Sequence, residues 1–209
     1  MDECFEQCAD SFGRMSNGKR CGLLSICIAL VAVIVYVAVA IEGVEPTEFA
    51  LIKNNLTQDV NQETQLSGGL HWVGVFYSLI HFPSVHKSIE FSGSQNSQYP
   101  KLNTRTKEGL ELQLSFSFQY QLNKKQLHNM YLLCQQDYEM VFARIARNAI
   151  LEEAGNYLAS AYWLNRTAVG DKMKDNLENR LQGIYANLSG FMLLNIDLPD
   201  SYEAAIVQT

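Results

Sequence analysis

Positive charge is scarce in this sequence. The 16 Lys and Arg residues are outnumbered by 22 Asp and Glu residues, so the formal net charge is −6 at pH 7. No run rich in Lys or Arg occurs anywhere along the chain. A protein that binds nucleic acid usually carries a basic patch on its surface. The composition therefore argues against nucleic acid as a partner.

Cysteine is nearly absent beyond the first part of the chain. Of the five cysteines only Cys134 lies in the main body, and the early four are Cys4, Cys8, Cys21 and Cys27. A single cysteine cannot form a disulfide framework within that body. A structural zinc ion needs four ligands, and the C-x3-C pair Cys4 and Cys8 has no second Cys or His pair nearby. We therefore predict no disulfide framework in the body and no metal site.

The usual motifs of catalysis are missing as well. The sequence has no HExxH, no GxSxG, no Walker loop and no dinucleotide-binding glycine fingerprint. The four histidines are scattered, and His128 and Cys134 would lie on roughly opposite sides of a helix. We expect no catalytic residue and no cofactor, and we predict that the protein is not an enzyme.

One long hydrophobic run is present. Residues 21–41 contain no charge and no proline. As a helix they would extend roughly 30 Å, which is the thickness of the hydrocarbon core of a bilayer. A signal peptide has a shorter apolar region, and a buried core helix would usually include some polar positions. We predict an uncleaved transmembrane helix over 21–41, preceded by a short tail, residues 1–20.

The charges on either side of this run predict its orientation. Basic residues precede it, and acidic residues follow it before the next basic residue, Lys53. The positive-inside rule then places the N-terminal tail in the cytosol and the body on the luminal or extracellular side. The alternative is the mitochondrial inner membrane, with the tail in the matrix and the body in the intermembrane space.

Two kinds of covalent modification have candidate sites. Four cysteines lie at or near the predicted cytosolic face: Cys4, Cys8, Cys21 and Cys27. They are either sites of palmitoylation or ordinary thiols. Three sequons follow the hydrophobic run, with acceptors Asn55, Asn165 and Asn187. A luminal body would make them candidates for N-glycosylation. Sequons also arise by chance, and Asn165 is also a candidate helix N-cap.

A second apolar segment, residues 67–83, is rich in aromatic residues. It is too short for a helical span and it contains three glycines. Aromatic side chains favour the membrane–water interface. We predict a loop that either dips into the near leaflet or folds over the protein's own core. The predicted membrane-contact residues are Trp72, Val73, Val75, Phe76, Tyr77, Leu79, Ile80 and Phe82.

Regular alternation marks the clearest strand. Residues 110–122 alternate almost without fault between apolar and polar side chains, which predicts a long strand with one apolar face. A turn joins it to residues 102–106, which predicts a β-hairpin. We expect further strands over 47–53, 85–91 and 191–198. The polar residues 54–65 are expected to form a loop.

Helical spacing of apolar residues begins near Lys124. It predicts helical structure up to Gly155 and a further helix over 166–187 that ends at Gly190. Asp200 resembles the start of a last helix. Strands followed by helices predict an α+β fold, in which helices cover one face of a mostly antiparallel sheet. The apolar face of 110–122 is then expected to face these helices and not lipid.

Taken in order, these segments resemble the SPFH family, also called band 7 (stomatin, prohibitin, flotillin). The similar stretches are "EGVEPTEFALI", "GGLHWVGVFYSLIHFP", "LNTRTKEGLELQLSFSFQYQL", "ARIARNAILEEAGNY", "NRTAVGDKMKDNLENRL" and "GFMLLNIDLPDSYEAAI". The resemblance implies an SPFH domain over 42–198 and the start of a C-terminal helix over 199–209. The layout is closest to prohibitin-like or erlin-like members. The turn Lys107-Glu108-Gly109 departs from the Asp-Gly that is common in the family.

This resemblance implies a membrane-anchored scaffold that assembles into a ring or cage and organises lipids and membrane proteins. Its expected partners are the lipid bilayer and a homo- or hetero-oligomer of SPFH-type subunits. An uncovered edge strand invites pairing with another chain, which also favours association. The alternative is a stoichiometric regulatory subunit of a membrane channel or protease, and a third hypothesis is a membrane-tethered hydrolase with an unrecognised site.

Overall fold

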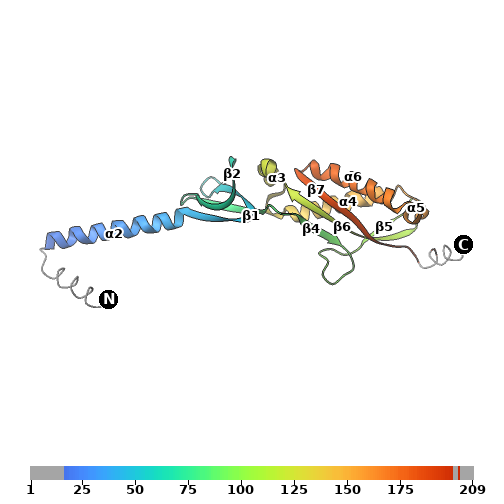
Figure 1. Cartoon of the computed structure of the whole chain (residues 1–209), viewed down its shortest axis with the longest axis horizontal. Helices are drawn as coiled ribbons and strands as arrows, with labels where there is room; N and C mark the ends of the chain where they lie inside the picture. Colours follow the sequence, from blue (N-terminus) through green and yellow to red (C-terminus); the bar gives the residue numbers. More distant parts are fainter. Residues whose placement is uncertain (1–16, 200–201, 203–209) are drawn as a thin grey trace.

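The molecule is elongated. The computed structural model describes residues 17–199 and residue 202, and the side chains of all of these except 17–24 and 62–64. A long helix forms one end, a three-stranded sheet follows it, and a larger sheet with its covering helices forms the other end (Figure 1). The predicted mixed α+β fold with antiparallel sheets is confirmed.

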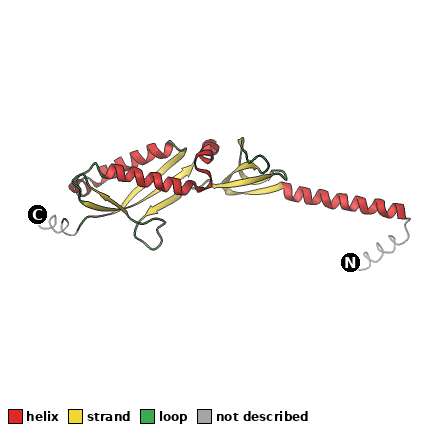
Figure 2. Ribbon diagram, turned by 180° about the vertical axis from the view of Figure 1, so that it is seen from behind, coloured by secondary structure: helices red, strands yellow, loops and turns green. Residues whose placement is uncertain are grey.

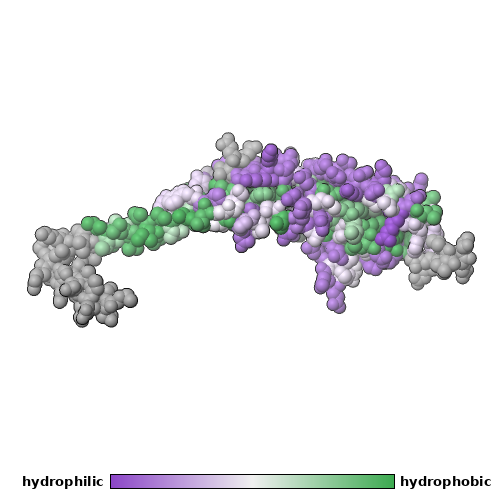
Figure 3. All heavy atoms as spheres, in the orientation of Figure 1, coloured by the Kyte–Doolittle hydropathy of each residue, from purple (hydrophilic) through white to green (hydrophobic). Residues whose placement is uncertain are grey.

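The first element, α2, covers Asn17–Ala40 and continues directly into β1, Ile41–Asn54. Its large apolar side chains between Ile26 and Val39 are exposed, and Figure 3 shows them as a continuous hydrophobic surface. Within the part of the chain that the structure describes, no helix combines the length and the apolar character that crossing a membrane requires.

The smaller sheet has the strand order β2–β1–β3, with β2 at Val60–Trp72 and β3 at Tyr77–Pro83. β1 pairs antiparallel with both neighbours. Two predictions were wrong here. Residues 60–65 of the predicted loop 54–65 belong to β2, and 67–83 contains the end of β2 and the whole of β3 instead of a loop. The polar start of β2 does not suggest a strand; it is a strand because its backbone hydrogen-bonds to β1.

The larger sheet is centred on β6, Glu111–Leu122. β7, Ala186–Asp197, lies along one side of β6, and β4, Lys87–Phe91, and β5, Leu102–Arg105, share the other side. The predicted alternation of β6 is confirmed at its core face, where the apolar side chains are almost fully buried: Leu112, Leu114, Phe116, Phe118, Tyr120 and Leu122.

Helices cover one face of this sheet (Figure 2). The two longest are α4, Tyr138–Ala154, and α6, Arg166–Gln182, which contact each other, and α6 also packs against β7. Both bury a stripe at helical spacing, which in α6 is Val169, Met173, Leu177 and Leu181. Shorter elements connect them: the 3-10 turns η1, Lys124–Gln126, and η2, Gln135–Asp137, and the helices α3, Leu127–Cys134, and α5, Ala159–Leu164.

Element boundaries differ from the prediction in three places. Gln135 has a φ of 53°, so the expected helix from 124 is broken between α3 and α4. α6 ends at Gln182 followed by Gly183, and Gly190 lies inside β7 opposite Gln119. Residues 186–190 are strand because β6 offers them hydrogen-bonding partners. Asn165 precedes α6 but makes no side-chain capping hydrogen bond.

Candidate functional site: the apolar tip and the open sheet face

The aromatic segment lies where α2 meets the smaller sheet. The backbone N–H groups of Val73 and Gly74 donate to the carbonyl oxygen of Ala40 at 2.9 and 3.1 Å, and the N–H of Asn55 donates to the carbonyl oxygen of Phe76 at 2.9 Å. The four residues 73–76 therefore join the two ends of β1. Gly74 has a φ of 95°, a conformation that a side chain would strain.

The predicted membrane-contact residues divide into two groups. Trp72 and Phe76 are each 60% exposed, and Tyr77 and Val75 are also exposed. The ring of Trp72 lies 6.3 Å from the ring of Tyr36 on α2, so the aromatic surface continues the apolar surface of the helix. We call the exposed residues of this segment the apolar tip: Leu70, Trp72, Val75, Phe76 and Tyr77.

The other predicted contacts face the protein interior. Val73, Ile80 and Phe82 are buried, and Leu79 is half-buried. The ring of Phe82 packs against those of Tyr131 and Tyr138 at 6.0 and 5.7 Å. These three side chains are not available to lipid; Ile80 and Phe82 lie on the same, inward face of β3, because alternate residues of a strand point to opposite faces. The sequence prediction missed two exposed apolar residues: Leu56, in the turn between β1 and β2, and Leu70, in β2 opposite Gly43.

The face of the larger sheet that points away from the helices is polar. β6 presents Glu111, Gln113, Ser115, Ser117, Gln119 and Gln121 on this face. Its neighbours add Asn103 and Arg105 from β5 and Asn195 and Asp197 from β7. Of the β6 residues, Ser115 is buried at 3% exposure. We call this surface the open face.

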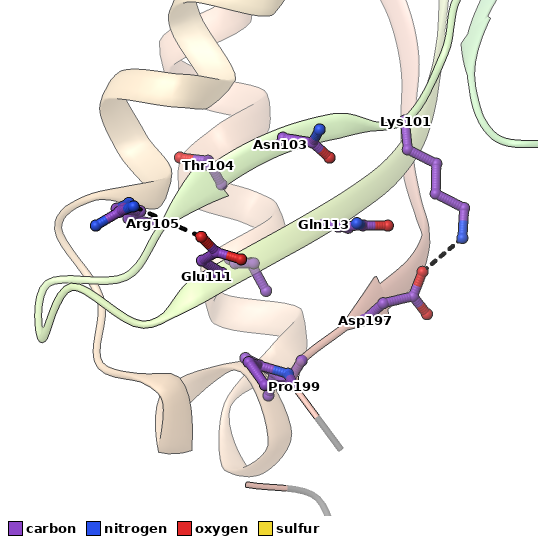
Figure 4. A pocket seen from close by; sticks show the side chains of 10 residues that line it. Lys101, Asn103, Thr104, Arg105, Glu111, Gln113, Asp197 and Pro199 are labelled. Carbon is purple, nitrogen blue, oxygen red and sulfur yellow. Dashed lines mark hydrogen bonds and ion pairs between the residues drawn. The ribbon is translucent and has the colours of Figure 1, made fainter. Parts of the chain in front are cut away.

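A hollow of about 730 Å³ occupies one end of the open face (Figure 4). Two ion pairs cross it: Lys101 Nζ lies 2.7 Å from Asp197 Oδ2, and Arg105 Nη2 lies 3.5 Å from Glu111 Oε1. Both pairs are solvent-accessible, so each contributes little to stability. The hollow is therefore self-neutralised and rich in hydrogen-bonding groups, which suits a protein surface better than a charged small ligand.

β7 is the outer strand on its side of the sheet. Among the described strands it pairs only with β6. The guanidinium of Arg166 donates to the carbonyl oxygens of Leu193 and Leu194 at 2.8 and 3.0 Å, which satisfies two acceptors of this edge. Met192 and Leu194 are exposed. The edge thus combines a strand that no second described strand covers with exposed apolar side chains, a combination that favours contact with another chain.

All three sequon asparagines are exposed. Asn55 lies in the turn after β1, where its Oδ1 accepts a hydrogen bond from Ser78 Oγ at 2.8 Å. Asn165 lies between α5 and α6, and Asn187 lies in β7 opposite Gln121. Cys27 is an exposed thiol on α2 and the backbone of Cys21 is helical, whereas Cys4 and Cys8 lie outside the described residues. Modification of any of these sites remains a prediction.

The buried titratable groups fit a structural role. Burial raises the pKa of Tyr138 to about 12 and also raises the pKa of Tyr120, whose hydroxyl donates to Glu139 Oε1 at 3.1 Å. Burial likewise raises the pKa of the Cys134 thiol, so it lacks the thiolate character of an activated nucleophile. No group of three or more His, Cys, Asp or Glu side chains within the described ranges is placed to hold a metal ion.

Comparison with known proteins identifies a family. The family model described as "SPFH domain / Band 7 family" matches residues 43–209. The match begins near the start of β1 and includes both sheets and all the helices that follow. No curated protein matches the chain.

Proposed function

Because the chain belongs to the SPFH domain / Band 7 family, we propose that it is a membrane-anchored scaffold that assembles with subunits of its own type. The family is associated with membranes, scaffolds and oligomers. Within that general role, the finer assignment depends on two surfaces of this chain. The first is the apolar tip with α2, and the second is the open face with the edge of β7.

The observation that carries the proposal is the continuous apolar surface at one end of the molecule. Large apolar side chains are exposed along α2, and the apolar tip extends that surface through the contact between Tyr36 and Trp72. Soluble monomers rarely expose so large a contiguous apolar patch, because its contact with water is unfavourable. A lipid bilayer supplies the missing cover, and aromatic side chains favour its interface.

In this proposal, residues 21–41 anchor the chain and the apolar tip rests on the near leaflet. The basic residues that precede the anchor place the N-terminal tail in the cytosol, and the body lies on the luminal or extracellular side. The mitochondrial inner membrane, with the body in the intermembrane space, is the alternative location. Digestion with an endoglycosidase distinguishes the two locations. A shift in mass shows that the body entered a secretory lumen, provided that the shift becomes smaller in one of three variants: Asn55→Gln, Asn165→Gln or Asn187→Gln.

The open face and the edge of β7 are the proposed surfaces for assembly into a ring or cage. The experiment is to extract the full chain in mild detergent and to measure particle mass and symmetry by electron microscopy. We expect a large homo- or hetero-oligomer for the unaltered chain. The double substitution Ser117→Arg and Gln119→Arg, on the open face, should disperse it, whereas Asp171→Arg on the exposed side of α6 should not.

A monodisperse monomer would overturn the scaffold proposal. A complex with one copy of a membrane channel or protease, without a large oligomer, would instead support the second candidate, a regulatory subunit. That candidate rests on the same open face, whose paired charges and amide side chains suit a protein partner as well as a second copy. Both candidates are binding functions without catalysis.

A further inference from the structure

A second cavity lies in the larger sheet domain, away from α2 and beside the helix α4; Lys101 lines both this cavity and the hollow of the open face. It has a volume of about 240 Å³ and lies between α4 and the segment that leads into β5. Its apolar lining includes Phe91, Tyr99, Leu102 and Ala143. Arg144 and Arg147 of α4 also line it, together with Lys101, which is already paired with Asp197. The small apolar cavity therefore has a cationic border.

The apolar wall is built from stacked rings. Phe91 stacks on Phe116 of β6 at a centroid distance of 4.6 Å, and Tyr99 stacks on Phe91 at 4.9 Å. The backbone of Tyr99 is fixed on both sides, since its N–H donates to Glu90 and its carbonyl oxygen accepts from Ser92. Phe91 is itself buried. The wall is therefore pre-organised, which lowers the entropic cost of binding an apolar group.

The cationic border comes from one face of α4. Met140, Arg144 and Arg147 follow one another at steps of four and three residues, so they form a single stripe on the helix. Among the described residues, neither Arg144 nor Arg147 makes an ion pair, whereas Arg180 pairs with Glu152. The hydrogen bond of Arg144 is to the thioether sulfur of Met140, at 3.2 Å.

This arrangement has a distinct ligand preference. Two guanidinium groups without acidic partners attract carboxylates, which they can bind in a bidentate manner. The cavity is smaller than the roughly 300–1,000 Å³ that is usual for a drug-sized ligand, so it suits a single apolar side chain. An apolar anchor beside carboxylates is the chemistry of an acidic peptide segment, and anchors of this kind dominate the energetics of many protein interfaces.

We propose that this cavity is a docking site for a short acidic segment of a partner protein. One large apolar or aromatic side chain of the segment enters the cavity, and its neighbouring carboxylates pair with Arg144 and Arg147. Position argues for a protein and against lipid. The cavity belongs to the larger sheet, whereas the apolar tip belongs to the smaller sheet, which lies between α2 and the larger sheet (Figure 1).

The test uses the full chain in detergent micelles and a phage-displayed library of random heptapeptides. We expect the enriched peptides to carry Asp or Glu beside Leu, Met, Phe, Tyr or Trp. Binding of the best peptide, labelled with fluorescein, is then measured by fluorescence anisotropy. The double substitution Arg144→Gln and Arg147→Gln should weaken it roughly 10- to 100-fold, as expected for the loss of one charge-assisted hydrogen bond or more.

Two further variants separate the cavity from net charge. Lys172→Gln with Lys174→Gln makes the same change of charge on the exposed side of α6 and should leave peptide binding unchanged. Met140→Trp narrows the cavity at a half-exposed position, so the fold is retained and binding should be lost.

Three outcomes would overturn the proposal. The first is enrichment of peptides without acidic residues, or no enrichment at all. The second is an equal loss of binding in the Lys172/Lys174 control. The third is binding to vesicles of phosphatidylcholine and phosphatidylserine that depends on Arg144 and Arg147, which would assign the site to a lipid surface. The oligomeric state does not enter any of these measurements, so they stand apart from the scaffold proposal.

Discussion

Trp72 gives the sharpest test of whether the apolar tip contacts lipid. The chain has two tryptophans, Trp72 in the tip and Trp163 at the opposite end of the molecule on α5, and they are 60% and 55% exposed. Their similar exposure makes Trp163 a matched control for position. Two single-tryptophan variants, Trp163→Phe and Trp72→Phe, isolate the fluorescence of each.

The magnitude follows from the exposed area. An aromatic side chain offers about 200 Å² of surface, so roughly 120 Å² of Trp72 is available to the surroundings. At about 25 cal/mol per Å², transfer of that area from water to lipid is favourable by about 3 kcal/mol. This corresponds to a preference of roughly 100-fold, so Trp72 should be in contact with lipid almost all the time.

The assay is quenching of tryptophan emission in vesicles whose acyl chains carry bromine. The full chain with Trp72 alone should be strongly quenched, and the chain with Trp163 alone should match its emission in unbrominated vesicles. Adding Phe76→Ser to the first variant removes a second exposed anchor and should reduce the quenching. Equal quenching of both tryptophans, or none at Trp72, would refute the membrane contact of the tip.

Three further predictions concern stability, each measured as the free energy of unfolding by chemical denaturation. Phe142→Ala should cost about 3–5 kcal/mol, because the ring is fully buried between Tyr120 and Tyr138; a loss below 1 kcal/mol would contradict this packing. Folding raises the pKa of Tyr138 from 10.0 to about 12 and also raises the pKa of Tyr120. The free energy of unfolding should therefore be unchanged below pH 10 and fall as the pH rises towards 12. A free energy of unfolding that stays constant between pH 10 and 12 would disprove the role of these two tyrosines. Gly68→Ala should destabilise by about 1–3 kcal/mol because its Cβ would lie 2.6 Å from the backbone of β1, whereas Gly170→Ala in α6 has open space and should stabilise by up to about 1 kcal/mol; the same sign for both would be inconsistent with these environments.

Periodicity predicted best those elements whose burial is one-sided. The side chains of β6 alternate because one face packs against helices and the other does not, and that difference is written directly into the sequence. The stripe of α6 from Val169 to Leu181 was predicted for the same reason. The order of these motifs also led to the family, which the match over 43–209 bears out.

Strands that are stabilised mainly by pairing with another strand were predicted poorly. β2 begins within a polar stretch that has little strand propensity of its own, and it is a strand because it pairs with β1. The start of β7 continues the helical spacing of α6, yet residues 186–190 pair with β6. Local sequence cannot show such pairing, because the partner lies far away along the chain.

The candidate sites show the same division. The sequence alone determined that residues 21–41 are apolar, that residues 67–83 are aromatic, and that β6 has a polar face, since composition and alternation are local properties. Only the tertiary structure decided that Trp72 and Phe76 point outward while Ile80 and Phe82 enter the core. It alone brought Phe91, Tyr99 and Arg144 around one cavity, because strand pairing and helix packing, unlike periodicity, join residues that are distant in sequence.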